Sequence, residues 1–227
     1  MKKVHDQVKA SPRPDLPLIF SEYNASYMNE VEVTDSPFMG PWLANTIRQC
    51  DGLVDTLAYW AFSDVFEEAG VVKRPFYGGY GLMAAGNIPK ASFNAFKLLH
   101  LLGEERLDAE SDSILVTRRA DSSLAVAVWN YTPPGGQGAP RRFTLLIKGL
   151  LEPAQARIHV VDRNHGSSRT AWEAMGKPDF PSREQQEKLR DAARLPPPQV
   201  KPVAGADPVT VRIALEPQAL ALVEVTR

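Results

Sequence analysis

The amino-acid sequence predicts a two-part fold, with an α/β region over residues 1–107 and an all-β region over residues 108–227. In the first region, short apolar runs alternate with stretches of helical spacing, which is typical of parallel β/α units. In the second region, short segments of alternating polarity are separated by Pro, Gly and Asp turns, which favours antiparallel strands. The 227 residues and the 44% hydrophobic content suffice for one large domain or two small ones.

The α/β region contains two predicted strands and two predicted helices. Residues 16–20 and 57–62 are short apolar runs, and each predicts a buried strand. Residues 41–50 carry apolar side chains at helical spacing. Residues 89–102 predict a second helix, with a proline near its start and a glycine directly after it. The order strand, helix, strand, helix is that of two consecutive β/α units.

Polar side chains follow both predicted strands. Residues 21–24, Ser-Glu-Tyr-Asn, come after the first strand, and the pairs at 63–64 and 67–68 come after the second. Both (β/α)8 barrels and open α/β sheets place functional residues at the carboxyl ends of parallel strands. A complete barrel needs about 250 residues, so only two of its units could lie in this chain.

The all-β region is expected to form an antiparallel sandwich of about five to seven short strands. A polar helix over residues 182–195 interrupts it, with Ser182 as its N-cap, inside a proline-rich loop that runs to Pro202. The strand segments are residues 113–132, with a turn at 121–123, and residues 141–150, 156–164, 209–217 and 219–226.

Composition and charge exclude several classes of partner. The 26 Lys and Arg residues almost balance the 27 Asp and Glu residues, so no positive field attracts nucleic acid or an anionic membrane. The apolar stretches are too short to span a bilayer. Cys50 is the single cysteine, which permits no internal disulfide. We therefore expect no nucleic-acid partner and no membrane partner.

The sequence contains no motif for a cofactor or a metal. Its four histidines are scattered among different segments without metal-ligand spacing. Residues 78–81, Gly-Gly-Tyr-Gly, lack the Gly-Lys-Ser/Thr ending of a phosphate loop and predict a tight turn. No Gly-x-Ser-x-Gly motif occurs either. We expect neither a cofactor nor a metal.

The N-terminal residues predict the last turns of an amphipathic helix that is stopped by Pro12 and Pro14. The first apolar stretch starts only at Leu16, so these residues are not a secretory signal. A chain that begins inside a helix is expected to lack its true N-terminus. Localisation, cytoplasmic or secreted, is therefore left open.

Five segments resemble consecutive pieces of family 39 glycoside hydrolases, chiefly bacterial β-xylosidases. The ten-residue segment YWAFSDVFEE has the most unusual composition and is the most specific of them. The resemblance implies that residues 1–107 are the last two units of a (β/α)8 TIM barrel and that residues 108–227 are a β-sandwich accessory domain. The segments are SEYNAS (21–26), YWAFSDVFEE (59–68), FYGGYGLM (76–83), GNIPKASFNAFKLLHLLG (86–103) and VDRNHGSSRTAWEAMGKPDFPSREQQEKL (161–189).

The same resemblance implies that Glu22 is the catalytic nucleophile, at the end of the seventh barrel strand. The residue type suits this role, since an ionised carboxylate held at a strand end can attack an anomeric carbon. A purely structural interpretation, in which Glu22 caps the turn after the strand, stands beside it.

Five further residues resemble or adjoin the family's sugar contacts. Trp60 offers an apolar ring face to a pyranose, and the carboxylates of Glu67 and Glu68 can accept hydrogen bonds from vicinal hydroxyls. Asn24 and Tyr27 could line the same pocket. The alternatives are a core position for Trp60, a solvated acidic loop for the glutamates, and turn-forming or packing roles for Asn24 and Tyr27.

The second carboxylate of the family is not in this sequence. The resemblance implies an acid/base residue within an Asn-Glu-Pro sequence, and the two Glu-Pro pairs of the chain, at 152–153 and 216–217, lack the asparagine and lie in the all-β region. Loss of general acid catalysis costs about 10²- to 10⁴-fold in rate. We expect the chain alone to be nearly inactive and to need the missing N-terminal part of the barrel. Its open strand edges also favour association, a homo-oligomer included.

Three functions remain at this point. The first is a retaining β-xylosidase that acts on xylo-oligosaccharides or another β-glycoside. The second is a non-catalytic carbohydrate-binding or assembly module. The third keeps the hydrolase but changes the sugar, for example to an iduronoside, as in other members of the family.

Overall fold

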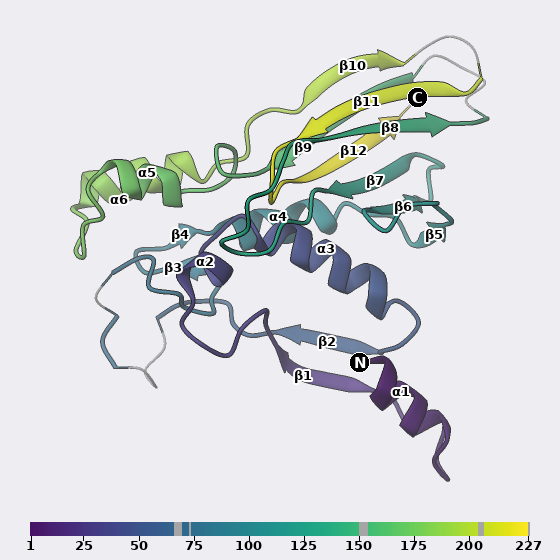
Figure 1. Cartoon of the computed structure of the whole chain (residues 1–227), viewed down its shortest axis with the longest axis horizontal. Helices are drawn as coiled ribbons and strands as arrows, with labels where there is room; N and C mark the ends of the chain where they lie inside the picture. Colours follow the sequence, from purple (N-terminus) through teal and green to yellow (C-terminus); the bar gives the residue numbers. More distant parts are fainter. Residues whose placement is uncertain (66–69, 73, 150–153, 204–206, 227) are drawn as a thin grey trace.

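The computed structural model describes residues 1–65, 70–72, 74–149, 154–203 and 207–226. The chain has mixed α/β content, and its elements stack in layers (Figure 1). A two-stranded antiparallel sheet covers a six-stranded sheet, two helices pack under that sheet, and a two-stranded parallel sheet lies beneath the helices. Within the described ranges, no helix is both long enough and apolar enough to cross a bilayer.

The six-stranded sheet is antiparallel throughout and has the order β10-β9-β12-β7-β6-β5. The predicted strands of the all-β region are confirmed, and the sheet already begins with β5, just before residue 108. β10 was missed because its segment is rich in proline, which is tolerated at a sheet edge. The strands are β5 (Glu105–Leu107), β6 (Ile114–Arg118), β7 (Leu124–Trp129), β9 (Ala154–Val161), β10 (Gln199–Val203) and β12 (Leu220–Thr226).

Both faces of this sheet are buried at its central strands, β7 and β12. Val126 and Val128 of β7 face the two-stranded sheet of β8 (Arg141–Ile147) and β11 (Val209–Leu215), where they join a common apolar core. Ala127 and Trp129, the alternate residues of the same strand, face the helices. Because side chains alternate along a strand, burial on both faces explains the nearly unbroken apolar run of β7.

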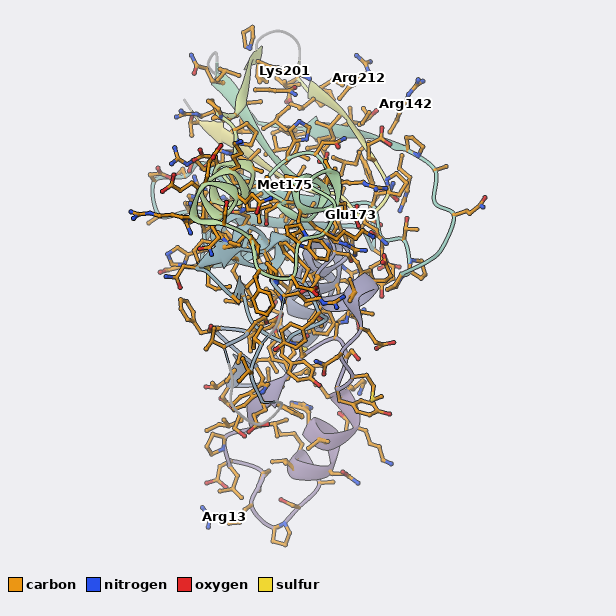
Figure 2. All side chains as sticks on the ribbon, turned by 90° about the vertical axis from the view of Figure 1, so that its left-hand side faces the viewer. Arg13, Arg142, Glu173, Met175, Lys201 and Arg212 are labelled. Atoms are coloured by element: carbon orange, nitrogen blue, oxygen red, sulfur yellow. The ribbon has the colours of Figure 1, made fainter. Side chains whose placement is uncertain are left out.

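The outer face of the β8–β11 sheet is mainly polar, although Leu146 is 61% exposed on it. Residues of β8 alternate between exposed and buried, and Arg142 is one of the exposed ones. Figure 2 places Arg142 and Arg212 at one end of the molecule, near Lys201 of β10, and Arg13 at the opposite end. The layers between them hold the buried cores.

Two helices form the next layer, α3 (Met39–Cys50) and α4 (Ala91–Leu99). They lie between the six-stranded sheet and the parallel pair of β1 (Ile19–Tyr23) and β2 (Thr56–Tyr59). Aromatic rings join the helices to the pair: Tyr23 stacks on Trp42 with centroids 5.6 Å apart, and Tyr59 meets Phe96 at 5.3 Å. The helices therefore cover one face of β1 and β2.

The prediction of a buried strand at residues 16–20 is wrong in position and in burial. β1 begins at Ile19, after Pro17, so Glu22 lies inside the strand rather than after it. Leu16 is 47% exposed and Ile19 is 58% exposed. The physical reason is that the described residues cover β1 from the helix side only.

Two further boundaries differ from the prediction. β2 ends at Tyr59 instead of residue 62, because the backbone of Ala61 and Phe62 pairs with residues 80–83. Pro89 lies in β4 (Ile88–Pro89), which pairs with β3 (Met83–Ala84), rather than in the helix. The backbone N–H of Lys90 donates to Leu82 O at 3.0 Å, and α4 begins only at the next residue.

The described part of the chain holds four further helices, which are short or peripheral: α1 (Lys2–Lys9), α2 (Val31–Thr34), α5 (Arg169–Ala174) and α6 (Arg183–Ala192). α1 and α6 match the predicted helical segments, and Ser182 caps α6 by accepting from Gln185 N at 3.2 Å in a capping box. α5 and α6 pack on β3 and β4 through an apolar cluster in which the Phe76 and Trp172 rings lie 5.3 Å apart.

Candidate functional site

Glu22 lies at the carboxyl end of β1, in an irregular stretch of the strand. Phe20 pairs with Leu57 and Tyr23 with Tyr59, so three steps along β1 match two steps along β2. Such a bulge re-aims the side chains that it contains, and bulges are common beside active sites. The Glu22 side chain is exposed. The fold therefore presents one carboxylate at the strand end where parallel sheets place their sites.

Asn24 binds the backbone of two neighbouring segments. Its Nδ2 donates to Tyr80 O at 3.1 Å and to Trp60 O, and its Oδ1 accepts from Ala25 N at 2.7 Å. Trp60 N in turn donates to Tyr23 O at 3.0 Å. The Asn24 carboxamide thus links the ends of β1 and β2 to residue 80.

The other predicted sugar contacts differ in their surroundings. Trp60 is half-buried directly after β2, and it is joined through its backbone to Tyr23 and Asn24. The Tyr27 side chain is 88% exposed, and its carbonyl accepts from the Tyr80 hydroxyl at 2.8 Å. Glu67 and Glu68 lie outside the described residues. The structure therefore brings Trp60 and Asn24 to the strand end that carries Glu22.

A buried cluster of charges lies beneath this site, and sequence reasoning missed it. Lys90 is 1% exposed, and its Nζ lies 2.5 Å from Asp35 Oδ1 and 2.7 Å from Asp64 Oδ2. The same nitrogen donates to Gly79 O at 2.9 Å. Asp35 follows α2 and Asp64 follows β2 by a few residues, so three segments that are distant in sequence meet at one ammonium group.

Burial and charge act against each other in this cluster. Burial raises the pKa of Asp64 to about 6, although the Lys90 ammonium acts in the opposite direction. Burial alone would lower the pKa of Lys90, but the carboxylates of Asp35 and Asp64 outweigh it and raise that pKa. Lys90 therefore stays charged, and Asp64 can take up a proton in mildly acidic solution.

The Gly-Gly-Tyr-Gly turn closes over the two carboxylates. Gly78 N donates to Asp35 Oδ2 at 2.5 Å, and Gly81 N donates to Asp64 Oδ1 at 2.6 Å. Gly78 has a φ of +86°, and a Cβ on Gly79 would lie 2.5 Å from the carboxyl carbon of Asp64. The turn thus needs glycine for backbone conformation and for close approach, which is consistent with the predicted tight turn.

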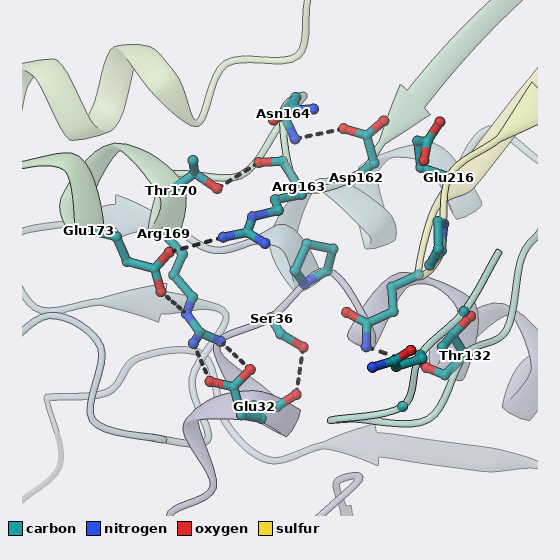
Figure 3. A pocket seen from close by; sticks show the side chains of 16 residues that line it. Glu32, Ser36, Thr132, Asp162, Arg163, Asn164, Arg169, Thr170, Glu173 and Glu216 are labelled. Atoms are coloured by element: carbon teal, nitrogen blue, oxygen red, sulfur yellow. Dashed lines mark hydrogen bonds and ion pairs between the residues drawn. The ribbon is translucent and has the colours of Figure 1, made fainter. Parts of the chain in front are cut away.

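A separate polar cavity of about 570 Å³ lies between α2, α5 and the loops at 132–138 and 216–218 (Figure 3). Within it, Arg169 contacts both Glu32 and Glu173, the latter at 3.2 Å. Hydrogen bonds from Arg169 hold the pKa of Glu32 below its usual range. Glu22 and Trp60 are not among the lining residues, so this cavity belongs to the junction of the two parts and not to the strand end.

Among the described side chains, no group of three or more His, Cys, Asp or Glu residues is placed to hold a metal ion. The described residues at the strand end supply a carboxylate, an aromatic ring and backbone amides.

Comparisons with known proteins place the chain among glycosidases. A profile of glycosyl hydrolases family 39 matches residues 1–207. A β-xylosidase of Geobacillus stearothermophilus is 38% identical over 191 residues, which cover 84% of this chain and 38% of that protein. A monomeric β-xylosidase from Caulobacter crescentus superposes with a TM-score of 0.86 at 25% identity, over 99% of this chain and 48% of that one. A family 39 enzyme from Xanthomonas axonopodis pv. citri superposes with a TM-score of 0.83 at 28% identity, over 99% of this chain and 47% of that one. The chain thus spans less than half the length of these relatives.

Proposed function

This chain belongs to glycosyl hydrolases family 39, and we propose that it carries the nucleophile, Glu22, of a retaining β-xylosidase. The observation that carries the proposal is the position of Glu22 in a strand bulge at the carboxyl end of a parallel pair. The similarity to two curated β-xylosidases, at 38% and 29% identity, supports xylose as the sugar.

We propose further that residues 1–107 are the last two units of a (β/α)8 barrel and that residues 108–227 are a β-sandwich accessory domain. The parallel pair of β1 and β2, with α3 and α4 on one face, supports the first assignment. The antiparallel sheets that share one apolar core support the second. The missing barrel units would lie against the exposed face and the open edges of β1 and β2.

The proposed reaction is a double displacement. A Glu22 carboxylate oxygen attacks the anomeric carbon of a terminal β-xylosyl residue while the bond to the leaving oxygen breaks, and a second carboxylic acid protonates that oxygen. The second group then deprotonates a water molecule, which displaces Glu22 and releases xylose. In retaining enzymes the two carboxyl groups stand about 5 to 5.5 Å apart.

The residues around Glu22 would bind and orient the substrate, a xylo-oligosaccharide. The ring face of Trp60 would pack against the C–H face of the xylose ring. Asn24, whose carboxamide is committed to backbone groups, would hold the strand ends in place rather than contact sugar. Contacts from Tyr27, Glu67 and Glu68 remain predictions.

We propose that the isolated chain is nearly inactive. Its sequence holds no Asn-Glu-Pro segment for the acid/base residue, and the chain matches less than half of the length of its relatives. An active protein then requires the remaining barrel units, in the same polypeptide or in a second chain.

The test uses a fusion protein, which we name the assembled enzyme. In it, the N-terminal part of the Geobacillus stearothermophilus β-xylosidase is joined to this chain in one polypeptide. Glu22→Gln in the assembled enzyme should lower the kcat for an aryl β-xyloside by about 10⁴-fold or more. Glu30→Gln, a nearby exposed carboxylate, is the matched control and should keep full turnover. Normal turnover by the Glu22→Gln variant would refute Glu22 as the nucleophile. If the assembled enzyme without any substitution binds sugar but does not turn it over, a carbohydrate-binding module would be favoured.

A further inference from the structure

Lys90 stands at the start of α4, and its side chain is buried. It is the N-cap of α4 and has an extended backbone, but its side chain turns inward and is 1% exposed. Burying an ammonium group is costly unless it is paired and hydrogen-bonded. Here the Nζ atom has three partners, the carboxylates of Asp35 and Asp64 and the carbonyl of Gly79.

Both carboxylates reach beyond Lys90 to the same turn. Asp35 accepts from Gly78 N, and Asp64 accepts from Gly81 N. Together with the hydrogen bond from Lys90 Nζ to Gly79 O, these contacts bind the backbone of residues 78, 79 and 81. The turn is therefore bound at three of its four residues by one ion cluster.

The fourth residue of the turn leads to the candidate active site. Tyr80 O accepts from Asn24 Nδ2, and the same nitrogen donates to Trp60 O. Ala61 N also donates to Tyr80 O, at 3.1 Å. A shift of the turn would thus move the backbone at Trp60 and the side chain of Asn24.

We propose that the buried cluster of Lys90, Asp35 and Asp64 is the positioning element of the candidate active site, which fixes the Trp60 ring relative to Glu22 through the turn at residues 78–81. The assignment of Trp60 and Glu22 rests on the proposed function, but the coupling between cluster and ring does not. Lys90 acts through other residues and is a positioning residue.

Protonation of Asp64 offers a direct way to perturb the cluster. Its pKa is raised to about 6 by burial, so below that pH the carboxyl group loses its charge and its ion pair with Lys90. Three ionisable groups face the cluster. The charge of Asp64 helps to raise the pKa values of Tyr59 and Tyr77, and the charge of Asp35 helps to raise that of Arg169. Burial raises the pKa of both phenols, so neither titrates near pH 6.

The experiment is an NMR pH titration of the 227-residue chain labelled with ¹⁵N. The backbone signal of Gly81 and the indole signal of Trp60, assigned with a Trp60→Phe variant, are followed from about pH 4.5 to about pH 9.5, a range that covers a rise of about 1 to 3 pH units. Both should titrate with one shared midpoint near pH 6. The indole signals of Trp129 and Trp172, which lie in other cores, should not follow that midpoint.

Lys90→Met supplies the second measurement. Without the ammonium, the shared midpoint should move to higher pH by about 1 to 3 pH units, because a neighbouring opposite charge lowers a carboxyl pKa by that much. Lys97→Met, an exposed lysine in the same helix, should leave the midpoint unchanged. The wild-type titration decides the question even if the Lys90→Met variant does not fold.

A Trp60 signal that stays constant while Gly81 titrates would overturn the coupling. A Gly81 signal that shows no titration over this pH range, in the wild type and in Lys90→Met alike, would overturn the role of the cluster. Neither outcome depends on turnover. The titration therefore tests the coupling, and the Glu22→Gln variant of the assembled enzyme separately tests the proposed function.

Discussion

The six-stranded sheet and the β1–β2 pair are both covered by the same two helices, but only the first is also covered on its other face. β8 and β11 seal the far side of the six-stranded sheet with an apolar core. The far side of β1 exposes Ile19 to 58%, and Leu16 just before it is 47% exposed. The far face of the six-stranded sheet is thus covered within this chain, whereas the far face of β1 is exposed.

The two regions also differ in the chemistry of their interiors. The core between the sheets consists of aliphatic side chains and one phenylalanine. Beneath the candidate site, by contrast, a lysine and two aspartates are buried together. A buried ion cluster contributes little net stability compared with apolar packing, and this one joins three distant segments at one ammonium group. This contrast suits a region whose geometry matters more than its stability.

Core truncation should show the largest difference between the two regions. Leu222→Ala in β12, where the side chain is fully buried, should cost about 2 to 5 kcal/mol in the free energy of unfolding. Ile19→Ala in β1 should cost about 0.5 kcal/mol or less in the isolated chain. Urea unfolding of both variants measures this, and equal costs would contradict the comparison. In the assembled enzyme the cost of Ile19→Ala should rise.

Alkaline pH should destabilise the helix layer beside β1 and β2. Burial raises the pKa of Tyr59 above its ordinary value of 10.0. Above pH 10 the phenol therefore ionises in the unfolded chain before it ionises in the folded one. The contribution of the buried phenol to stability is complete below pH 10 and is lost as the pH rises further. One such group costs up to about 1.4 kcal/mol for each pH unit above 10. Tyr23 and Lys90, whose pKa values are also raised, act in the same direction.

Tyr59→Phe should therefore reduce the slope of unfolding free energy against pH above 10. Thermal unfolding between pH 8 and 11.5 measures the slope. Tyr131→Phe, at a ring that is 41% exposed, is the control and should leave the profile as it is. A slope that Tyr59→Phe does not change would show that the phenol is solvated.

The capped helix of the all-β part should give the smallest effect. Ser182→Ala removes the side-chain half of the capping box of α6 and should cost about 1 kcal/mol. Ser182→Asp retains an acceptor at the N-cap and should stay close to the wild type. Equal losses in both variants, measured by urea unfolding, would show that the hydroxyl contributes through something other than the cap.

The all-β region could be predicted well from its sequence because local signals determine its strands. In β8, Phe143, Leu145 and Ile147 alternate with Arg142, Thr144 and Leu146, and the first three form one buried face. The turn at residues 121–123 separates β6 from β7 as expected. β10 escaped because two competing signals, proline and a polar composition, masked an edge strand.

The α/β region was less predictable because its pairing depends on residues outside the local pattern. The apolar run at residues 57–62 reads as one strand, but hydrogen bonds from residues 80–83 take over after Tyr59. Glu22 was predicted as the nucleophile through the resemblance of its segment to a family motif, and that role stays a prediction. Lys90 carried no such signal, since its burial requires carboxylates from two distant segments.

The most direct test of the account is covalent trapping of Glu22 in the assembled enzyme. A 2-deoxy-2-fluoro-β-xyloside with a dinitrophenolate leaving group reacts at the nucleophile without acid assistance, and the fluorine slows release of the glycosyl-enzyme. Peptide mapping by mass spectrometry should find one fluoroxylosyl group on the peptide with Glu22, and none in the Glu22→Gln variant. A label on another carboxylate, or turnover of aryl xylosides without any label on Glu22, would contradict the assignment.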